Sequence, residues 1–365
     1  MTQNGSQGRG GDPVLVVEDL TVQFPTGDGV VSAVRGVNYE LRRGEVLGIV
    51  GESGSGKSVT SLAVMGLLPK TARVTGSIRF GGKDLLKSNE KDLNKVRGRG
   101  IAMVFQDPMT SLNPVYTVGD QIAEAITAHH DVRKDVAKKQ AVELLDLVRI
   151  PNPKQRADEY PHQLSGGMRQ RVVIAIAMAN NPDVIIADEP TTALDVTVQA
   201  QILEALQAAQ KETGAAMVLI THDLGVIAGQ ADRVHVMYAG KVVESGTVDD
   251  IFYNPRMPYT LGLLGSLPRL DVKTERLTPI TGSPPATQNM PPGCPFSPRC
   301  PLSQPICDEE EPALVAGPNG QHAACHFTEQ VVGKDPAELF SPTSADAAAV
   351  PVAVDAVATD TETNR

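Results

Sequence analysis

A glycine-rich segment in the first part of the chain constrains the possible folds more than any other feature. Residues 51–58 read GESGSGKS and fit the pattern G-x-x-x-x-G-K-S/T. Residues 45–50 before it predict a short buried strand, and residues 58–68 after it predict a helix that Pro69 stops. A strand, loop and helix in this order direct backbone N–H groups toward phosphate oxygens. The segment therefore predicts a nucleoside triphosphate site, with an ordinary glycine-rich turn as the weaker alternative.

Each residue type in this loop has a physical role. Glycines let the backbone curl around phosphates without clashes from Cβ atoms. Lys57 would reach the β and γ phosphates, and the hydroxyl of Ser58 would ligate Mg²⁺. The loop residues predicted to bind the nucleotide are Gly51, Ser53, Gly54, Ser55, Gly56, Lys57 and Ser58.

The composition is that of a protein that folds in water. The chain has 365 residues, of which 41% are hydrophobic and 21% charged. Its longest apolar run, Val172 to Ala179, is much shorter than the roughly 20 residues of a membrane-spanning helix. Residues 1–12 are polar and lack the apolar core of a signal peptide. We therefore expect a cytoplasmic protein.

Charge and aromatic content argue against nucleic acid as a partner. The formal net charge is -10, and aromatic residues make up 4% of the chain, with no Trp. Binding to a phosphate backbone normally uses clustered Lys and Arg, and base stacking uses aromatic side chains. DNA and RNA are therefore not expected as primary partners.

The hydrophobic pattern predicts an α/β fold with a mainly parallel core sheet and helices on its faces. The expected strands are 14–24 and 34–41, which form an antiparallel β flap, and 45–50, 101–105, 184–188, 217–221, 233–238 and 241–244 in the core. Without an internal repeat, one nucleotide-binding domain is expected. The expected organisation is a disordered leader at 1–12, this domain at 13–251 with a helical subdomain at about 117–170, a small Cys-rich extension at 252–327 and a disordered tail at 328–365.

Four polar residues follow predicted core strands and are candidates for the same site. They are Gln106, Asp188, Glu189 and His222. Ligand sites of parallel sheets gather at the carboxyl ends of the strands. Asp188 is expected to contact Mg²⁺ directly or through water, and Glu189 to orient or deprotonate the water that attacks the γ-phosphate. Taken singly, each residue fits a solvated loop position better than a ligand contact, and only their order along the chain favours a site.

A second glycine-containing segment precedes another predicted helix. Residues 164–167 read LSGG, and the helix continues to about residue 179. The exposed N–H groups and the dipole at a helix start favour an anion there, although an ordinary Ser cap gives the same pattern. This helix start cannot easily serve the phosphates that residues 51–58 of the same subunit hold.

The order of these segments resembles that of the ATP-binding subunits of ABC transporters. It runs from the phosphate loop through Gln106, LSGG at 164–167, Asp188 and Glu189, and ALD at 193–195 to His222. The resemblance covers about residues 14–250 and implies an ABC-type P-loop NTPase that hydrolyses ATP. Met168 departs from the Gln that is frequent in this family, and we expect little loss because neighbouring groups would make the phosphate contacts.

The resemblance implies roles within one subunit. Phe24 would stack on adenine, and Gln106 would contact Mg²⁺ or water and couple the site to the membrane subunits. Glu189 would act as the catalytic base and His222 would contact the γ-phosphate. Because every catalytic position carries the active residue type, we expect a site that can hydrolyse ATP.

The resemblance also implies roles across a subunit interface. Ser165, Gly166 and Gly167 would bind the ATP that a partner subunit holds, and Asp195 would bridge the dimer interface. A working enzyme therefore needs a second such domain, supplied by a homologous ATPase, which gives a heterodimer and is the favoured arrangement, or by a copy of itself.

All four cysteines lie close together near the end of the chain. They are Cys294, Cys300, Cys307 and Cys325. Cytosolic disulfides are uncommon, so the choice is among an iron–sulfur cluster, zinc and four independent thiols. No C-x-x-C pair is present, which weakens the zinc hypothesis, and His322 and His326 are possible substitute ligands.

The region around these cysteines resembles the C-terminal extension of oligopeptide and dipeptide importer ATPases. The segments 254–260, NPRMPYT, and 291–301, PPGCPFSPRCP, carry this resemblance, and Met257 departs from the His that is more usual there. The resemblance implies a 4Fe-4S cluster on the four cysteines, with Zn²⁺ as the alternative and a structural role.

The resulting hypothesis is the ATPase of a peptide importer, located peripherally on the cytoplasmic face of the cell membrane. Its expected partners are a second ATPase subunit, two transmembrane permease subunits and an extracytoplasmic substrate-binding protein. A related importer of nickel, glutathione or oligosaccharides is the alternative within this class. A soluble ABC ATPase of DNA repair or ribosomes, and a metal-binding regulator without catalysis, are alternatives outside it.

Overall fold

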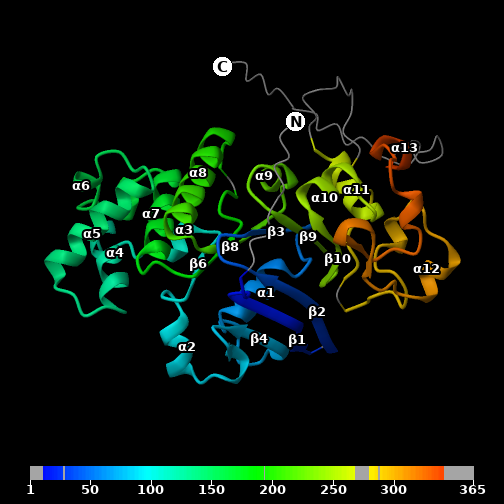
Figure 1. The fold of residues 1–365 in the computed structure, drawn as a ribbon, viewed down its shortest axis with the longest axis horizontal. Helices are drawn as coiled ribbons and strands as arrows, with labels where there is room; N and C mark the ends of the chain where they lie inside the picture. Colours follow the sequence, from blue (N-terminus) through cyan, green and yellow to red (C-terminus); the bar gives the residue numbers. More distant parts are fainter. Residues whose placement is uncertain (1–10, 28, 193, 268–278, 287, 341–365) are drawn as a thin grey trace, which may run out of the picture.

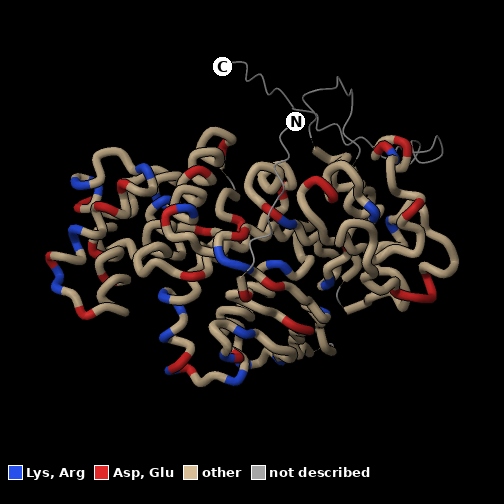
Figure 2. Tube along the Cα trace, viewed as in Figure 1, with Lys and Arg blue, Asp and Glu red and all other residues tan. Residues whose placement is uncertain are grey.

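A computed structural model describes residues 11–27, 29–192, 194–267, 279–286 and 288–340 of the chain. Within them lie a four-stranded and an eight-stranded sheet, with helices around both (Figure 1). The expected leader therefore lies outside the described residues except for its last two positions, and Ala193 lies outside them too. Lys and Arg are interspersed with Asp and Glu over the elements (Figure 2).

The core sheet has the order β11-β12-β10-β9-β3-β8-β7-β6. Five consecutive strands, which end with the edge strand β6, pair in parallel: β9 (Arg233–Tyr238), β3 (Val46–Val50), β8 (Ala216–Thr221), β7 (Val184–Asp188) and β6 (Ile101–Val104). β3, β6, β7 and β8 are buried along their whole length. A parallel sheet covered on both faces explains why these segments read as continuous apolar runs, as the sequence predicts.

The second sheet is the antiparallel flap, with the order β2-β1-β4-β5. Its strands are β1 (Leu15–Thr26), β2 (Gly29–Leu41), β4 (Arg73–Phe80) and β5 (Lys83–Asp84). Apolar side chains of the flap pack with α1 (Lys57–Val64) and one face of the core sheet in a shared hydrophobic cluster. The sequence predicts β1 and β2, and β4 is an addition that only the structure reveals.

Helices cover the other face of the core sheet and form the expected helical subdomain (Figure 1). The subdomain contains α4 (Val118–Thr127), α5 (Lys134–Leu147), α6 (Pro153–Arg156), η2 (Pro161–Gln163) and the start of α7 (Gly166–Met178). α7 also contacts β6 and α8 (Val196–Thr213), so it links the subdomain to the sheet. The remaining short elements before residue 230 are η1 (Leu85–Lys87), α2 (Glu90–Val96), α3 (Pro108–Ser111) and α9 (Leu224–Ala228).

The C-terminal extension is joined to the core sheet. β12 (His322–Ala323) pairs with β10 (Lys241–Thr247), and β11 (Val315–Ala316) pairs with β12. The buried carboxylate of Glu244 on β10 accepts hydrogen bonds from the backbone N–H of Arg256 and the side chain of Gln321. The other elements are α10 (Val248–Tyr253), α11 (Pro258–Gly265), η3 (Ser297–Arg299), α12 (Pro305–Glu309), η4 (Pro318–Gly320), η5 (Thr328–Gln330) and α13 (Pro336–Phe340).

The extension continues past the predicted boundary at residue 327. η5 and α13 are ordered elements, α13 contacts α11, and Phe340 packs against the hydrophobic cluster of the core. The tail expected from residue 328 is therefore wrong for residues 328–340, because apolar residues such as Val331 and Phe340 find a surface to bury against. Residues 341–365 lie outside the described part.

A buried histidine on β9 makes stability depend on pH. His235 is 8% exposed, its Nδ1 has no hydrogen-bond partner, and burial lowers its pKa from 6.5 to about 3. The unfolded chain therefore binds a proton below pH 6.5 that the folded chain excludes, so stability is lost as the pH falls through this window. We expect His235→Phe, which keeps a ring beside Tyr39, to remove about 1 kcal/mol of the destabilisation between pH 6.5 and 5.5.

Urea unfolding of both proteins at the two pH values measures this difference. Equal losses of stability in His235→Phe and the wild type would contradict a neutral, buried His235.

Candidate functional site

The carboxyl ends of the parallel strands bring the predicted site residues together. β3 leads into the phosphate loop at 51–56, β7 ends at Asp188 with Glu189 next, and β8 ends just before His222. Gln106 follows β6, the strand that pairs with β7. Strands that run in one direction end at one edge of the sheet, which is why segments far apart in sequence meet there.

Two glycines of the phosphate loop are required by its geometry. Gly51 has a φ of 154°, and a Cβ there would lie 2.2 Å from the backbone oxygen of Met237. Gly56 has a φ of 99° and caps the start of α1, and a Cβ there would lie 2.5 Å from the backbone oxygen of Ala33. The loop is thus packed directly against β9 and the flap, which fixes its path.

Lys57 is the first residue of α1, and its ammonium group lies in the centre of this loop. Its Nζ donates hydrogen bonds to the carbonyl oxygens of Gly51 at 2.7 Å and Glu52 at 2.9 Å, and the residue is 4% exposed. Burial lowers the pKa of Lys57, whereas the carboxylates of Glu189, Asp188 and Glu52 oppose that change. A cation confined beside three acidic groups has the charge and the donors to bind phosphate oxygens.

Ser58 and Asp188 form a pair of oxygen ligands of the kind that Mg²⁺ prefers. The Ser58 hydroxyl donates to Asp188 Oδ1 at 2.9 Å. Burial raises the pKa of Asp188, and the hydrogen bond from Ser58 opposes the increase. Mg²⁺ is usually held by one or two protein oxygens together with substrate phosphates, so this donor set fits the ion. Among the described residues no three His, Cys, Asp or Glu side chains form a metal site on their own.

Glu189 is held by three polar side chains. Its Oε2 accepts hydrogen bonds from Thr192 Oγ1 at 2.9 Å and Gln106 Nε2 at 3.2 Å, and it lies 3.4 Å from His222 Nδ1. The backbone of Glu189 has a φ of 46°, a left-handed conformation that is unusual for a residue with a side chain. The structure therefore brings Gln106, Glu189 and His222 together, as their positions after strands predict.

Thr192 is a site residue that the sequence reasoning missed. It lies three residues after Glu189, and its hydroxyl contacts the Glu189 carboxylate. The short segment PTT at 190–192 carries no signal by itself. A polar residue three positions after the predicted catalytic carboxylate was the available clue.

Most of the predicted site residues line one cavity of about 800 Å³, whereas Gly51, Asp188 and Thr192 do not reach its wall. Its volume lies within the ~300–1,000 Å³ range of small-molecule sites. The lining residues are Ala33, Glu52, Ser53, Gly54, Ser55, Gly56, Lys57, Ser58, Val59, Gln106, Glu189, His222 and Leu263. Phe24, predicted to stack on adenine, lies on β1 and does not line this cavity, so its role stays a prediction.

The LSGG segment lies apart from this cavity, at the start of α7. Ser165 caps the helix by accepting the N–H of Met168 at 3.3 Å. A Cβ on Gly167 would lie 2.4 Å from Val198 Cγ1, so that glycine permits close packing of α7 on α8. Asp195 caps α8 by accepting the N–H of Val198. Neither Ser165 nor Gly166, Gly167 or Asp195 lines the cavity of their own subunit.

The four cysteines line a small common cavity in the extension. Cys294, Cys300, Cys307 and Cys325 surround it together with Phe296 and Phe327, and all four are free thiols. Burial raises the pKa of the Cys294, Cys300 and Cys325 thiols. No group of ligands placed to hold a metal ion is found among the described residues, so the geometry does not itself support the predicted cluster.

None of the described helices combines the length and the apolar character that crossing a lipid bilayer requires. The longest helices carry charged residues along their exposed faces, as α5 and α8 illustrate.

Two family models match different parts of the chain. Residues 34–192 match the model "ABC transporter", and residues 243–307 match "Oligopeptide/dipeptide transporter, C-terminal region". The first match contains the phosphate loop, Gln106, the LSGG segment and Glu189. The second contains Cys294, Cys300 and Cys307.

Curated relatives match most of the chain. The oligopeptide transport ATP-binding protein OppD of Mycobacterium tuberculosis is 56% identical over 90% of this chain and 54% of its own length. The dipeptide transport ATP-binding protein DppD of Bacillus subtilis is 54% identical over 87% of this chain and 96% of its own length. OppD of Escherichia coli is 50% identical over 86% of this chain and 93% of its own length. The chain thus spans about half the length of the mycobacterial relatives.

Solved structures of ATP-binding cassettes share the fold of the nucleotide-binding part. A dimeric post-hydrolysis state of the cassette MJ0796 bound to ADP and Pi has a TM-score of 0.57 and 28% identity, covering 64% of this chain and 98% of that one. The subunit cbiO1 of a Clostridium perfringens transporter complex has a TM-score of 0.56 and 31% identity, covering 66% of this chain and 91% of that one.

Proposed function

This chain belongs to the ABC transporter family, among its oligopeptide and dipeptide transport ATP-binding proteins, and from that premise we propose that it hydrolyses ATP to drive peptide import. The observation that carries the proposal is the position of Glu189. Its carboxylate is held by Gln106, Thr192 and His222 at the wall of the cavity that also contains Lys57.

Each of these residues has a role in the proposed reaction. Lys57 and the loop N–H groups would hold the β and γ phosphates. Ser58 and Asp188 would hold a Mg²⁺ ion, which would neutralise charge at the phosphates. Glu189 accepts a proton from the attacking water, and Gln106 and His222 orient that water and the γ-phosphate. Phosphoryl transfer depends mainly on such positioning and on charge stabilisation, which this arrangement provides.

We propose further that the site is completed by a second subunit. Ser165, Gly166 and Gly167 start α7 away from the cavity of their own chain, with N–H groups available at an exposed helix start. They would contact the nucleotide of a partner ATPase, and Asp195 would lie at the interface. Two solved structures of one relative, the cassette MJ0796, are described as dimeric, which supports an obligate pair.

The proposed partners are two transmembrane permease subunits and an extracytoplasmic substrate-binding protein, with the chain peripheral on the cytoplasmic face of the membrane. Purification of the tagged chain from detergent-solubilised membranes tests this assignment. We expect permease subunits and a second ATPase to co-purify. Recovery of ribosomes or DNA in place of membrane subunits would contradict a role in transport.

We propose that the four cysteines hold a 4Fe-4S cluster. The supporting observations are the four thiols around one cavity and the free state of all four. When bound, such a cluster would supply a covalent connection among four segments of the extension. We expect anaerobically purified protein to contain about four iron and four acid-labile sulfide atoms per chain, and Cys300→Ser to lower both. Zinc without sulfide would contradict the cluster and favour the alternative.

A further inference from the structure

A buried arginine beside Cys300 contacts the phosphate loop. The guanidinium of Arg299 donates to both carboxylate oxygens of Glu52, at 2.6 Å and 2.9 Å, and its side chain is 4% exposed. Glu52 is the second residue of the GESGSGKS segment, 247 positions away in sequence. A bidentate ion pair therefore joins the cysteine-containing extension to the phosphate loop.

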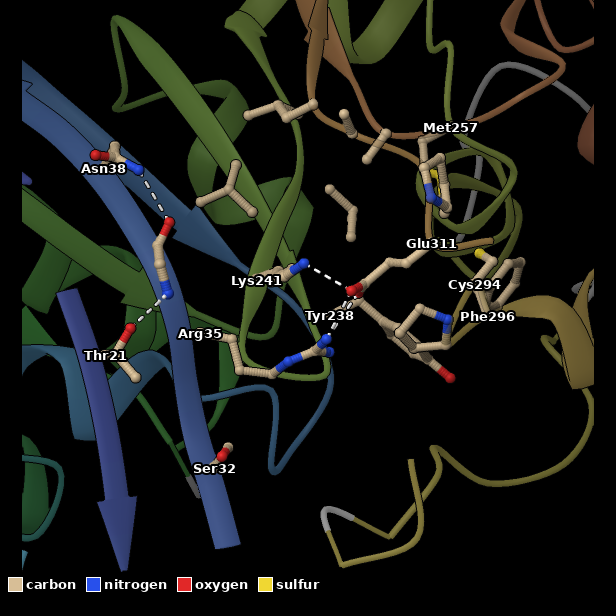
Figure 3. A pocket seen from close by; sticks show the side chains of 18 of the residues that line it. Thr21, Ser32, Arg35, Asn38, Tyr238, Lys241, Met257, Cys294, Phe296 and Glu311 are labelled. Carbon is tan, nitrogen blue, oxygen red and sulfur yellow. Dashed lines mark hydrogen bonds and ion pairs between the residues drawn. The ribbon is translucent and has the colours of Figure 1, made fainter. Parts of the chain in front are cut away.

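Contacts with three further residues hold Arg299 in position. Its Nε donates to the carbonyl oxygen of Thr281 at 3.0 Å, and one terminal nitrogen lies 3.3 Å from the hydroxyl of Tyr238. The guanidinium also lies 5.9 Å from the ring centroids of both Tyr238 and Phe296. Figure 3 shows Tyr238 and Phe296 close together with Cys294 near them. Such a packed guanidinium has little freedom to move away from Glu52.

The backbone and the side chain of Glu52 both make hydrogen bonds where the extension meets the phosphate loop. Its N–H donates to the hydroxyl of Tyr259 on α11 at 2.8 Å, and its carbonyl oxygen accepts from Lys57 Nζ at 2.9 Å. Glu52 also lines the cavity that holds Lys57 and Glu189. A carboxylate at this place adds a negative charge to a site whose proposed ligand carries several, and repulsion between them is strong where water is partly excluded.

We propose that Arg299 is a positioning residue for the ATP site, which neutralises Glu52 and holds its carboxylate toward the extension and away from the triphosphate. Arg299 does not touch the reacting atoms. It acts through Glu52, whose carbonyl oxygen contacts the loop lysine, so the fold of the extension sets the affinity of the phosphate loop for nucleotide. This inference rests on the proposed ATP site.

The test is equilibrium binding of a fluorescent ATP analogue with Mg²⁺ to the full-length chain, well below its unfolding temperature. We expect Arg299→Gln to raise the Kd about tenfold, because the Glu52 charge is then unpaired beside the phosphates. Adding Glu52→Gln should restore the affinity to within about threefold of the wild type, since the repelling charge is gone. Unchanged affinity in Arg299→Gln would overturn the proposal. A double variant that binds the analogue as weakly as Arg299→Gln would also overturn it, because the loss of affinity would then come from lost packing alone.

A milder substitution keeps the test decisive if Arg299→Gln does not fold. Arg299→Lys retains the charge and loses the bidentate geometry, so we expect a Kd about threefold higher than that of the wild type. Adding Glu52→Gln to this variant should reverse the increase. If the affinity stays low after Glu52→Gln is added, neutralisation of Glu52 is not the role of Arg299.

A matched control breaks a different ion pair between the extension and the body. Glu311 pairs with Arg35 on β2 and Lys241 on β10, beside a cavity of about 570 Å³ that also contacts Tyr238 and Phe296 (Figure 3). Glu311→Gln should leave the Kd unchanged, because none of these three side chains lines the phosphate cavity. An equal loss of affinity in this control would overturn a specific role for Arg299.

Two further comparisons separate this inference from the function on which it rests. If the wild type binds the analogue no better than Lys57→Ala does, the proposed ATP site fails and the inference fails with it. If the wild type binds and the Arg299 variants bind equally well, only the inference fails. In the assembled transporter we expect Arg299→Gln to raise the KM for ATP with kcat almost unchanged. This pattern indicates a loss of binding that is equal in the ground state and the transition state.

Discussion

Lys57→Ala is expected to lower the affinity for MgATP at least about 100-fold. The Nζ of Lys57 is the buried cation at the centre of the phosphate loop, where it contacts two loop carbonyl oxygens and lies near three carboxylates. Removing it leaves the phosphates facing Asp188, Glu189 and Glu52 without the charge that offsets them, and losing one partner of a buried charged contact costs about 2–5 kcal/mol.

Equilibrium binding of the fluorescent ATP analogue measures this loss. Lys138→Ala is the matched control, because Lys138 is half exposed, pairs with Asp120 in the helical subdomain and does not line the phosphate cavity. We expect that control to bind as the wild type does. Wild-type affinity in Lys57→Ala would mean that residues 51–58 do not hold phosphates, and the assignment of the cavity would be wrong.

Glu189→Gln is expected to reduce ATP hydrolysis by the assembled transporter about 1,000-fold while leaving nucleotide binding nearly intact. The amide keeps the size and the hydrogen bonding of the carboxylate to Thr192 and Gln106 but cannot accept a proton from water. General-base catalysis typically contributes about 10²- to 10⁴-fold to a rate, so its loss has an effect of this size.

Phosphate release from the purified complex at saturating ATP measures the effect. Glu204→Gln on α8 is a suitable control, because Glu204 is exposed, pairs with Arg149, and neither residue lines the cavity. That control should retain the full rate. Unchanged hydrolysis in Glu189→Gln would exclude Glu189 as the base and would require another group near the γ-phosphate.

The sequence predicts the parts of this molecule that depend on local pattern. Continuous apolar runs indicate the parallel strands, because a strand covered on both faces has no polar side. Polar residues directly after those runs indicate the site, because parallel strands end at one edge. Gln106, Asp188, Glu189 and His222 could therefore be predicted from their positions, and the structure brings them to one edge.

Contacts between distant segments could not be predicted in this way. Tyr259 contacts Glu52 across 207 positions and Arg299 contacts it across 247, and neither spacing leaves a pattern in the sequence. β12 joins the core sheet with only two residues, too few for any periodicity. α13 has five residues, and its packing depends on a surface that α11 provides. Tertiary contacts decide these features, and local propensity does not.

ATP hydrolysis at the site of Lys57 and Glu189 is expected to drive peptide uptake. The most direct measurement is uptake of a radiolabelled oligopeptide by cells in which the gene for this chain has been deleted and then restored as the wild type or as Glu189→Gln. We expect the wild type to restore uptake, and Glu189→Gln, present at the same level in the membrane, not to restore it. Full uptake in the deleted strain, or restoration by Glu189→Gln, would contradict it.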